Sequence, residues 1–279
     1  MKLIWKNFNL DFASKTYVMG ILNITPDSFS DSGLYLNKNR AVEHVLKMLE
    51  EGADIIDIGG ESTRPGADRI SVKEEIKRVV PVIEKLAGKI KIPISIDTCK
   101  SAVAKAALSS GASIVNDISG LWFDRKMPEV VARHNIPLVI MHIKGTPKNM
   151  QKNPVYKALI PEIIDYLRGS IEFARSAGVE EDKIIIDPGI GFGKTVQHNL
   201  EIIKRLNEFA GLEKPILLGP SRKSFIGKSL GGFPVTERLE GTASAIAIGI
   251  FNGANIIRVH DVKAMVRVAK IADSIKRSF

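Results

Sequence analysis

The chain has 279 residues, of which 44% are hydrophobic and 25% charged, a composition that can form a large soluble core. Its net charge is +9, but the basic residues are dispersed among acidic ones, which argues against nucleic-acid binding. No apolar run approaches the length of a membrane span, and the N-terminus lacks a signal-peptide pattern. With one cysteine, Cys99, no internal disulfide can form, and we expect a cytoplasmic protein.

The first residues of the chain show apolar side chains at alternate positions. This period-2 pattern is typical of a strand with one buried face, and we expect a strand, or one arm of a hairpin, that covers one end of the fold. The apolar positions are Leu3, Trp5, Phe8, Leu10 and Phe12.

Short β-branched runs then alternate with amphipathic stretches. The runs predict strands that are buried on both faces, at Val18–Ile24, Asp54–Gly59, Ile94–Asp97, Ser113–Asp117, Pro137–His142, Lys183–Asp187, Pro215–Gly219 and Ile256–His260. Helical periodicity predicts helices at Arg40–Glu51, Val72–Leu86, Ser101–Ser109, Ile160–Ala177, His198–Phe209, Arg238–Asn252 and Val262–Ser274.

The joints between these elements repeat as well. Gly52, Gly111, Gly178 and Gly253 each follow a predicted helix and precede a predicted strand, where a left-handed C-cap favours glycine. No stretch has the composition of a domain linker. We therefore predict one domain over residues 1–279, a single (β/α)₈ TIM barrel of the α/β class. An open doubly wound sheet is the alternative, but it would place a glycine fingerprint after the first long strand, and none occurs there.

Polar residues stand at the carboxyl ends of nearly all of the predicted strands. In this barrel class the active site lies at that end, and charges at the ends of buried strands need partners. The positions are Asn23, Asp57, Asp97, Asn116, Asp117, His142, Asp187, the run from Ser221 to Lys223, Arg258 and His260. Together they predict an active site.

Two βα loops, at about residues 23–37 and 59–71, exceed the usual two to six residues and are rich in Gly, Pro, Ser and Asp. We expect them to act as substrate lids. The segment from Pro188 to Thr195 resembles a P-loop, but Pro188 stands where a P-loop needs glycine, so we reject a nucleotide site. This turn instead lets Phe192 offer its face to a flat ring. The five histidines show no metal-cage spacing and one cysteine cannot form a thiolate site, but the sequence is compatible with a weakly held Mg²⁺ whose other ligands are substrate oxygens.

Seven ordered blocks of sequence closely resemble dihydropteroate synthases, enzymes of folate biosynthesis built on a pterin-binding barrel. The resemblance runs from about Met19 to Val262, and the blocks are Gly20–Ser30, Asp57–Gly66, Ser95–Thr98, Val115–Asp117, Asp187–Gly193, Ser221–Phe225 and Arg258–His260. It implies a transferase that joins 6-hydroxymethyl-7,8-dihydropterin pyrophosphate to p-aminobenzoate and releases pyrophosphate. It also implies Mg²⁺, sensitivity to sulfonamides and a homodimer.

The resemblance further implies a role for individual residues. The pterin would be bound by Asp97, Asn116, Met141, Asp187, Phe192, Gly219, Lys223 and Arg258. The p-aminobenzoate would be bound by Phe29, Thr63, Arg64, Pro65, Lys223 and Ser224. Pyrophosphate would meet Asn23, Thr63, Arg258 and His260, with Asn23 also on the metal. The catalytic groups would be Asp97, Asp187, Lys223, Arg258 and His260, acting in a dissociative displacement with both carboxylates ionised.

Two other functions stay open at the level of sequence. A methyltetrahydrofolate-dependent methyltransferase would share the strand-end Asp and Asn pattern, but it should lack the Ser-Thr-Arg-Pro-Gly loop and the Arg258/His260 pair. A pterin-binding protein without catalytic activity would carry the same motifs, and only a turnover assay separates it from an enzyme.

Overall fold

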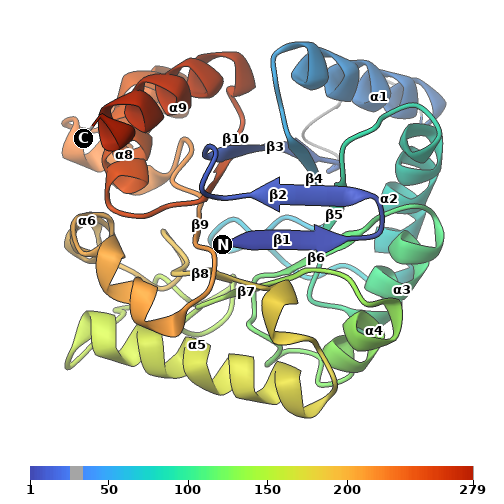
Figure 1. The fold of residues 1–279 in the computed structure, drawn as a ribbon, viewed down its shortest axis with the longest axis horizontal. Coiled ribbons are helices and arrows are strands. Elements are labelled where there is room, and N and C mark those ends of the chain that lie inside the picture. The colour runs from blue at the N-terminus through green and yellow to red at the C-terminus, as the bar shows by residue number, and fades with distance from the viewer. Residues whose placement is uncertain (26–33, 279) are drawn as a thin grey trace.

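The computed structural model describes residues 1–25 and 34–278, and its centre is an eight-stranded parallel barrel (Figure 1). Strands that follow one another in the chain are paired, β10 returns to pair with β3, and a bridge between Ile186 and Ile216 joins the two ends of the sheet. This confirms the predicted barrel. The strands are β3 (Tyr17–Asn23), β4 (Ile55–Gly59), β5 (Ile94–Asp97), β6 (Ile114–Asp117), β7 (Leu138–Met141), β8 (Ile184–Asp187), β9 (Leu217–Leu218) and β10 (Ile256–Val259).

Helices surround the barrel and connect its strands. They are α1 (Leu34–Glu50), α2 (Val72–Ala87), α3 (Ser101–Ser109), α4 (Met127–His134), α5 (Leu159–Ser176), α6 (Val196–Lys204), α7 (Ser224–Ser229), α8 (Leu239–Phe251) and α9 (Val262–Arg277). Short 3₁₀ turns add η2 (Glu181–Lys183), η3 (Leu206–Leu212) and η4 (Val235–Glu237). Sequence periodicity did not predict α4 and α7, because eight and six residues are too few to show a helical repeat.

The helix predicted at His198–Phe209 is wrong at both ends. The hydroxyl of Thr195 accepts a hydrogen bond from the backbone N–H of His198 at 3.2 Å, so α6 begins at Val196. The helix ends at Lys204, and the rest of the predicted stretch forms η3. The four glycine joints are as predicted, with φ between +92° and +118°.

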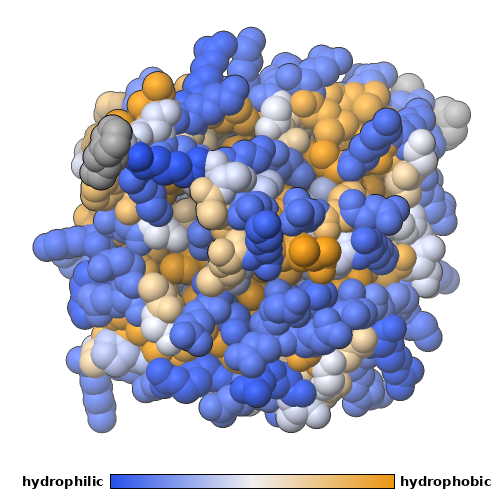
Figure 2. Space-filling model, in the orientation of Figure 1, coloured by the Kyte–Doolittle hydropathy of each residue, from blue (hydrophilic) through white to orange (hydrophobic). Residues whose placement is uncertain are grey.

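The N-terminal segment forms both arms of a hairpin, where the alternation predicted one strand or one arm. β1 (Lys2–Trp5) and β2 (Phe8–Asp11) pair antiparallel and lie across one end of the barrel (Figure 1). Their buried side chains Leu3, Trp5 and Leu10 belong to the continuous hydrophobic core of the barrel. The outer surface at this end shows mainly hydrophilic side chains with hydrophobic areas between them (Figure 2).

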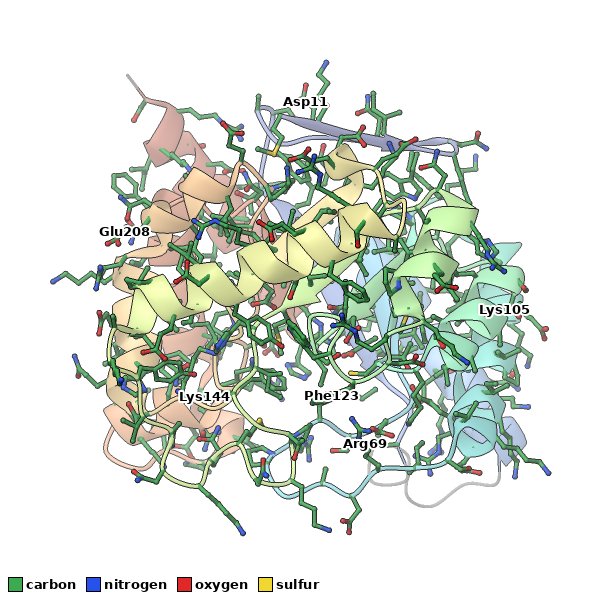
Figure 3. The ribbon with its side chains drawn as sticks, turned by 90° about the horizontal axis from the view of Figure 1, so that it is seen from below. Asp11, Arg69, Lys105, Phe123, Lys144 and Glu208 are labelled. Atoms are coloured by element: carbon green, nitrogen blue, oxygen red, sulfur yellow. The ribbon has the colours of Figure 1, made fainter. Side chains whose placement is uncertain are left out.

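The hairpin and the long βα loops lie at opposite ends of the molecule. Figure 3 shows Asp11 of the hairpin at one end and Arg69, Phe123 and Lys144, all from βα connections, toward the other. Among residues 1–25 and 34–278, no helix is long and apolar enough to cross a membrane.

Candidate active site at the carboxyl ends of the strands

Arg258 holds two carboxylates together at the carboxyl ends of the strands. Its Nε donates to Asp57 Oδ2 at 2.6 Å, and its Nη2 donates to Asp97 Oδ2 at 2.6 Å. Asn116 Nδ2 donates to the same oxygen of Asp57 at 3.1 Å. Arg258 comes from β10, and the acidic residues come from β4 and β5, so this contact reaches across strands that are not neighbours. The cluster joins three predicted pterin residues to Asp57.

Burial dominates the electrostatics of this cluster. Asp97 is 8% exposed, and burial raises its pKa to about 7, although the positive charge of Arg258 opposes the shift. The negative charge of Asp57 adds to the rise. A pKa near neutrality would make the charge of Asp97 sensitive to pH in this range, and the predicted ionisation of both carboxylates stays a prediction. The other oxygen of Asp57, Oδ1, is buried and has no hydrogen-bond partner among the described residues.

Asp187 and Lys223 form the second part of the site. Burial raises the pKa of Asp187, whose Oδ1 accepts a hydrogen bond from the backbone N–H of Gly189 at 2.7 Å. Burial lowers the pKa of Lys223 to about 8, and its Nζ donates to the carbonyl of Ile190. The same Nζ lies 4.5 Å from the centroid of the Phe192 ring, a cation–π distance. The glycine turn after β8 therefore places the ring of Phe192 in the same part of the site as Asp187 and Lys223.

His260 lies at the end of β10, next to Arg258. Its Nδ1 is 3.0 Å from the hydroxyl of Ser221, which also accepts the backbone N–H of His260 at 3.2 Å. Burial, together with the positive charges of Arg258 and Arg222, lowers the pKa of His260 to about 4, although the negative charge of Asp261 opposes the shift. His260 is neutral at pH 7.

The β4–α2 loop carries Thr63, Arg64 and Pro65. Arg64 and Pro65 are exposed, and Thr63 is half-buried. The loop is tied to the β7–α5 connection by the Gly66 N–H, which donates to the carbonyl of Pro147 at 3.0 Å.

Comparisons with known proteins show the family of this chain. The family model described as pterin binding enzyme matches residues 19–260. Dihydropteroate synthase from Bacillus subtilis is 49% identical over 95% of this chain and 90% of that protein, and the Escherichia coli enzyme is 43% identical over 98% and 96%. The Yersinia pestis dihydropteroate synthase solved with a sulfonamide drug superposes with a TM-score of 0.94, at 42% identity and full coverage of both chains.

A dihydropteroate synthase from Clostridium difficile, solved with pteroic acid, gives a TM-score of 0.91 at 46% identity, covering 96% of this chain and all of that one. This chain belongs to the dihydropteroate synthase family of pterin-binding enzymes. The family assignment agrees with the barrel and with the ordered motifs.

Within this dihydropteroate synthase fold, the predicted residues fall into three groups. Contacts or electrostatic interactions connect Asp97, Asn116, Asp187, Lys223 and Arg258. Met141 and Phe192 share a small apolar cluster with Ile118, Ile143 and Met150. Gly219 lies beside Arg258, and Ser224 begins α7 and lines a cavity of about 420 Å³ with Gly191 and Lys194. Phe29 lies outside the described residues.

Asn23 stands at the end of β3, where the metal was predicted. Its Oδ1 and the Oδ2 of Asp97 both lie 3.7 Å from the point that a Cβ on Gly59 would occupy. In the described part of the chain, no three His, Cys, Asp or Glu side chains gather as a metal cage. One amide oxygen suits a Mg²⁺ that takes its other ligands from phosphate and water, so the residues present fit such an ion.

Two further residues of the site escaped the sequence-based assignment. Asp57 was noted as a strand-end residue, but only the packing shows that it holds Arg258 and Asn116. Lys194, considered in the rejected P-loop, is 3% exposed and places its Nζ 2.9 Å from His142 Nδ1 and 3.0 Å from the carbonyl of Phe192. It secures the turn that carries Phe192. No periodicity or motif could have revealed either contact.

Proposed function

We propose that this protein joins 6-hydroxymethyl-7,8-dihydropterin pyrophosphate to p-aminobenzoate and forms 7,8-dihydropteroate and pyrophosphate. The observation that carries the proposal is the Arg258 cluster, in which one guanidinium links two strand-end carboxylates next to His260. The solved relatives support it, since they include complexes with pteroic acid, 4-aminobenzoic acid and 7,8-dihydropteroate.

The pterin fits the rigid strand ends. Its amino group and ring N–H groups are donors that the carboxylates of Asp97 and Asp187 can accept, and Asn116 can both donate and accept. Lys223 can donate to the ring carbonyl, and Phe192 offers an apolar face. A ligand without these polar groups would leave buried polar atoms unpaired, so the site selects pterins.

Departure of pyrophosphate fits the corner at Arg258 and His260. The guanidinium can stabilise the growing negative charge, and neutral His260 can donate a hydrogen bond to a phosphate oxygen. Mg²⁺ held by Asn23 and by the phosphates would supply further charge neutralisation. Ionised Asp97 and Asp187 would favour the positive charge left on the pterin methylene carbon. The amine nitrogen of p-aminobenzoate then forms the new C–N bond and loses its proton to solvent.

The second substrate fits between the β4–α2 loop and the start of α7. Thr63, Arg64 and Pro65 come from the loop, and Lys223 and Ser224 come from the other side. Phe29 completes our assignment, although it lies outside the described residues.

The test is incubation with the pterin pyrophosphate, p-aminobenzoate and Mg²⁺ while pyrophosphate release and dihydropteroate are measured together. We expect both products in equal amounts. Pterin binding without turnover would favour a non-catalytic pterin-binding protein. Methyl transfer from methyltetrahydrofolate in place of pyrophosphate release would favour the methyltransferase alternative.

We also propose a homodimer that works in the cytoplasm. Two adjacent helices support it: α8 exposes Ile248 and Phe251, and α9 exposes Ile271 and Ile275, each between 52% and 65%. Such a surface suits burial against a second copy. Sedimentation velocity should show a dimer that Phe251→Glu disrupts, and Val155→Glu, at another exposed apolar residue, should leave it intact. A monomer in the unmodified protein would contradict the proposal.

A further inference from the structure

The β4–α2 loop is closed at its neck by one carboxylate. Glu61 stands at the start of the loop, and its Oε2 accepts a hydrogen bond from the backbone N–H of Ile70 at 3.0 Å, nine residues later. The segment between them carries Thr63, Arg64 and Pro65. A single side chain thus joins the two ends of the segment that we assign to the second substrate.

Lys100 anchors this neck to the barrel. Its Nζ contacts the same Oε2 of Glu61 and also lies 2.6 Å from Glu75 Oε2. Lys100 follows Asp97 by three residues and precedes α3, while Glu75 belongs to α2. The ion network therefore joins the loop, the helix that follows it and the end of the strand that carries Asp97.

Burial makes this network more than a surface ion pair. The side chain of Glu75 is 1% exposed, and those of Lys100 and Glu61 are 17% and 20% exposed. Partial burial opposes the charge on Lys100, but its bonds to Glu61 and Glu75 raise its pKa overall. Removing one member of a buried ion network leaves the other charges without compensation, so the contacts are strongly interdependent.

The upstream end of the loop has one further tie. Arg78 of α2 donates through Nη1 to the carbonyl of Gly60 at 3.0 Å and pairs with Glu74 at 2.9 Å. This tie holds the exit from β4. Farther along, Gly66 bonds to Pro147, Asp68 pairs with Lys148 and Arg69 lies over the Phe123 ring, so the returning chain has other contacts with the β6–α4 and β7–α5 connections. Among the described residues, the hydrogen bond that ties the Ile70 backbone to the start of the loop is accepted by Glu61, which Lys100 holds.

We propose that Lys100 is a positioning residue for p-aminobenzoate: through Glu61 it holds the neck of the β4–α2 loop, and so sets Thr63 and Arg64 relative to Asp97. This inference rests on the proposed function of the site. Lys100 does not touch the reacting atoms. Its loss should loosen the loop-built pocket and leave the pterin contacts at the strand ends in place.

The test compares Lys100→Met with Lys105→Met and Lys100→Arg. Lys105 is exposed on α3, the helix that Lys100 precedes, at the periphery of the molecule (Figure 3), so its substitution controls for loss of a nearby positive charge. Lys100→Met leaves Glu75 buried without its partner, so a double variant, Lys100→Met with Glu75→Gln, keeps the experiment possible if the single variant unfolds. Thermal melting identifies the folded variants.

The first measurement is steady-state kinetics with each substrate varied in turn. We expect the KM for p-aminobenzoate to rise about ten-fold or more in Lys100→Met, since small misplacements at an active site are costly, and the KM for the pterin pyrophosphate to change less than about three-fold. Lys100→Arg should recover part of the loss, and Lys105→Met should behave as the unmodified protein. Equal changes in both KM values, or none in a folded variant, would overturn the proposal.

The second measurement needs no substrate. Trypsin can cut after Arg69, and the bond it cuts includes the Ile70 nitrogen that Glu61 holds. We expect cleavage at this bond, followed by mass spectrometry, to accelerate about ten-fold in Lys100→Met and not in Lys105→Met, because an open neck exposes the bond. An unchanged rate of cleavage in Lys100→Met would overturn the proposal that Lys100 holds the neck of the β4–α2 loop. If the unmodified protein releases no pyrophosphate, the proposed function fails, and this readout still reports on the neck.

Discussion

The two ends of the barrel are built from the same strands but differ in the kind of side chain that they bury. At the amino end, the hairpin buries Leu3 and Trp5, and the polar groups of Thr16 are paired with Asp273 at 2.7 and 2.8 Å. At the carboxyl end, buried carboxylates of Asp57 and Asp97 share one guanidinium. The first end gains stability from apolar burial, whereas the second keeps desolvated charges close together.

The difference shows which end is optimised for folding. Each end has a buried side-chain atom without a partner among residues 1–25 and 34–278, Trp5 Nε1 in the hairpin and Asp57 Oδ1 at the site, so these atoms do not separate the two ends. The charges do, because burial at the carboxyl end shifts the pKa of Asp97, Asp187 and Lys223 toward the neutral forms. Such arrangements cost stability and cluster at functional sites. If this comparison is right, substitutions at the amino end should change stability, and substitutions at the carboxyl end should change binding and turnover.

The largest effect is expected at the hairpin. Trp5→Ala should lower the free energy of unfolding by about 3–5 kcal/mol, because it empties a buried site 3% exposed. Urea denaturation measures this. Ile4→Ala, at a neighbouring residue 54% exposed, should change stability by less than about 0.5 kcal/mol. If folded Trp5→Ala had a strongly altered KM for either substrate, the separation between the two ends would be lost.

At the opposite end, Arg258→Ala should lower kcat by a factor of about 10²–10³, the usual cost of losing one group that stabilises transition-state charge. His260→Ala should act in the same direction. Both variants should impair pyrophosphate-dependent steps more than the binding of a pterin without pyrophosphate. Activity assays measure the pyrophosphate-dependent steps, and calorimetry measures binding of the pterin without pyrophosphate. An equal loss in turnover and in pterin binding would refute the role of Arg258 and His260 at the phosphates.

Next in size, Asp97→Asn and Asp187→Asn should each weaken pterin binding by about 2 kcal/mol, the scale of a charge-assisted hydrogen bond plus an unpaired donor. Titration calorimetry with a pterin that lacks pyrophosphate isolates this step. Asp68→Asn, at an exposed loop carboxylate, is the matched control. Unchanged affinity in both site variants would show that the pterin binds elsewhere.

A smaller effect should connect the rigid strand ends to the loop. A sulfonamide should bind about 1–3 kcal/mol more tightly when pyrophosphate and Mg²⁺ are present, because the anion gives Arg64 a partner and favours an ordered β4–α2 loop. Direct titration with and without pyrophosphate measures the coupling. Equal affinities would mean that the loop-built pocket is preformed.

The smallest effect concerns pH. Burial places the pKa of Asp97 at about 7 in the ligand-free site, so this carboxyl is mostly protonated below that pH. Because the pterin N–H groups require the ionised form, affinity should fall about ten-fold for each pH unit below 7, with release of one proton on binding. Asp97→Asn should flatten this dependence. A flat profile in the unmodified protein would show that Asp97 is ionised throughout.

Much of this molecule follows from local sequence. The order of the barrel elements could be predicted from the β-branched runs, the helical periodicity and glycines such as Gly52 and Gly253. These signals are strong because buried parallel strands and left-handed helix ends restrict residue type. The helices α4 and α7 were not predicted because they are too short to show a helical repeat, whereas the N-terminal hairpin was one of the two forms that the alternation predicted. The strand-end polar residues predicted the position of the candidate site, since parallel strands bring their carboxyl ends to one face.

What only the tertiary structure decided is which of these side chains meet. Arg258 reaches Asp57, 201 residues earlier in the chain, and Lys100 meets Glu61 and Glu75 from two other elements. The sequence identified the charged residues and the end of the barrel at which they stand, since residue type and strand polarity are local properties. Their pairing and their pKa shifts depend on distance and burial, which exist only once the barrel has closed.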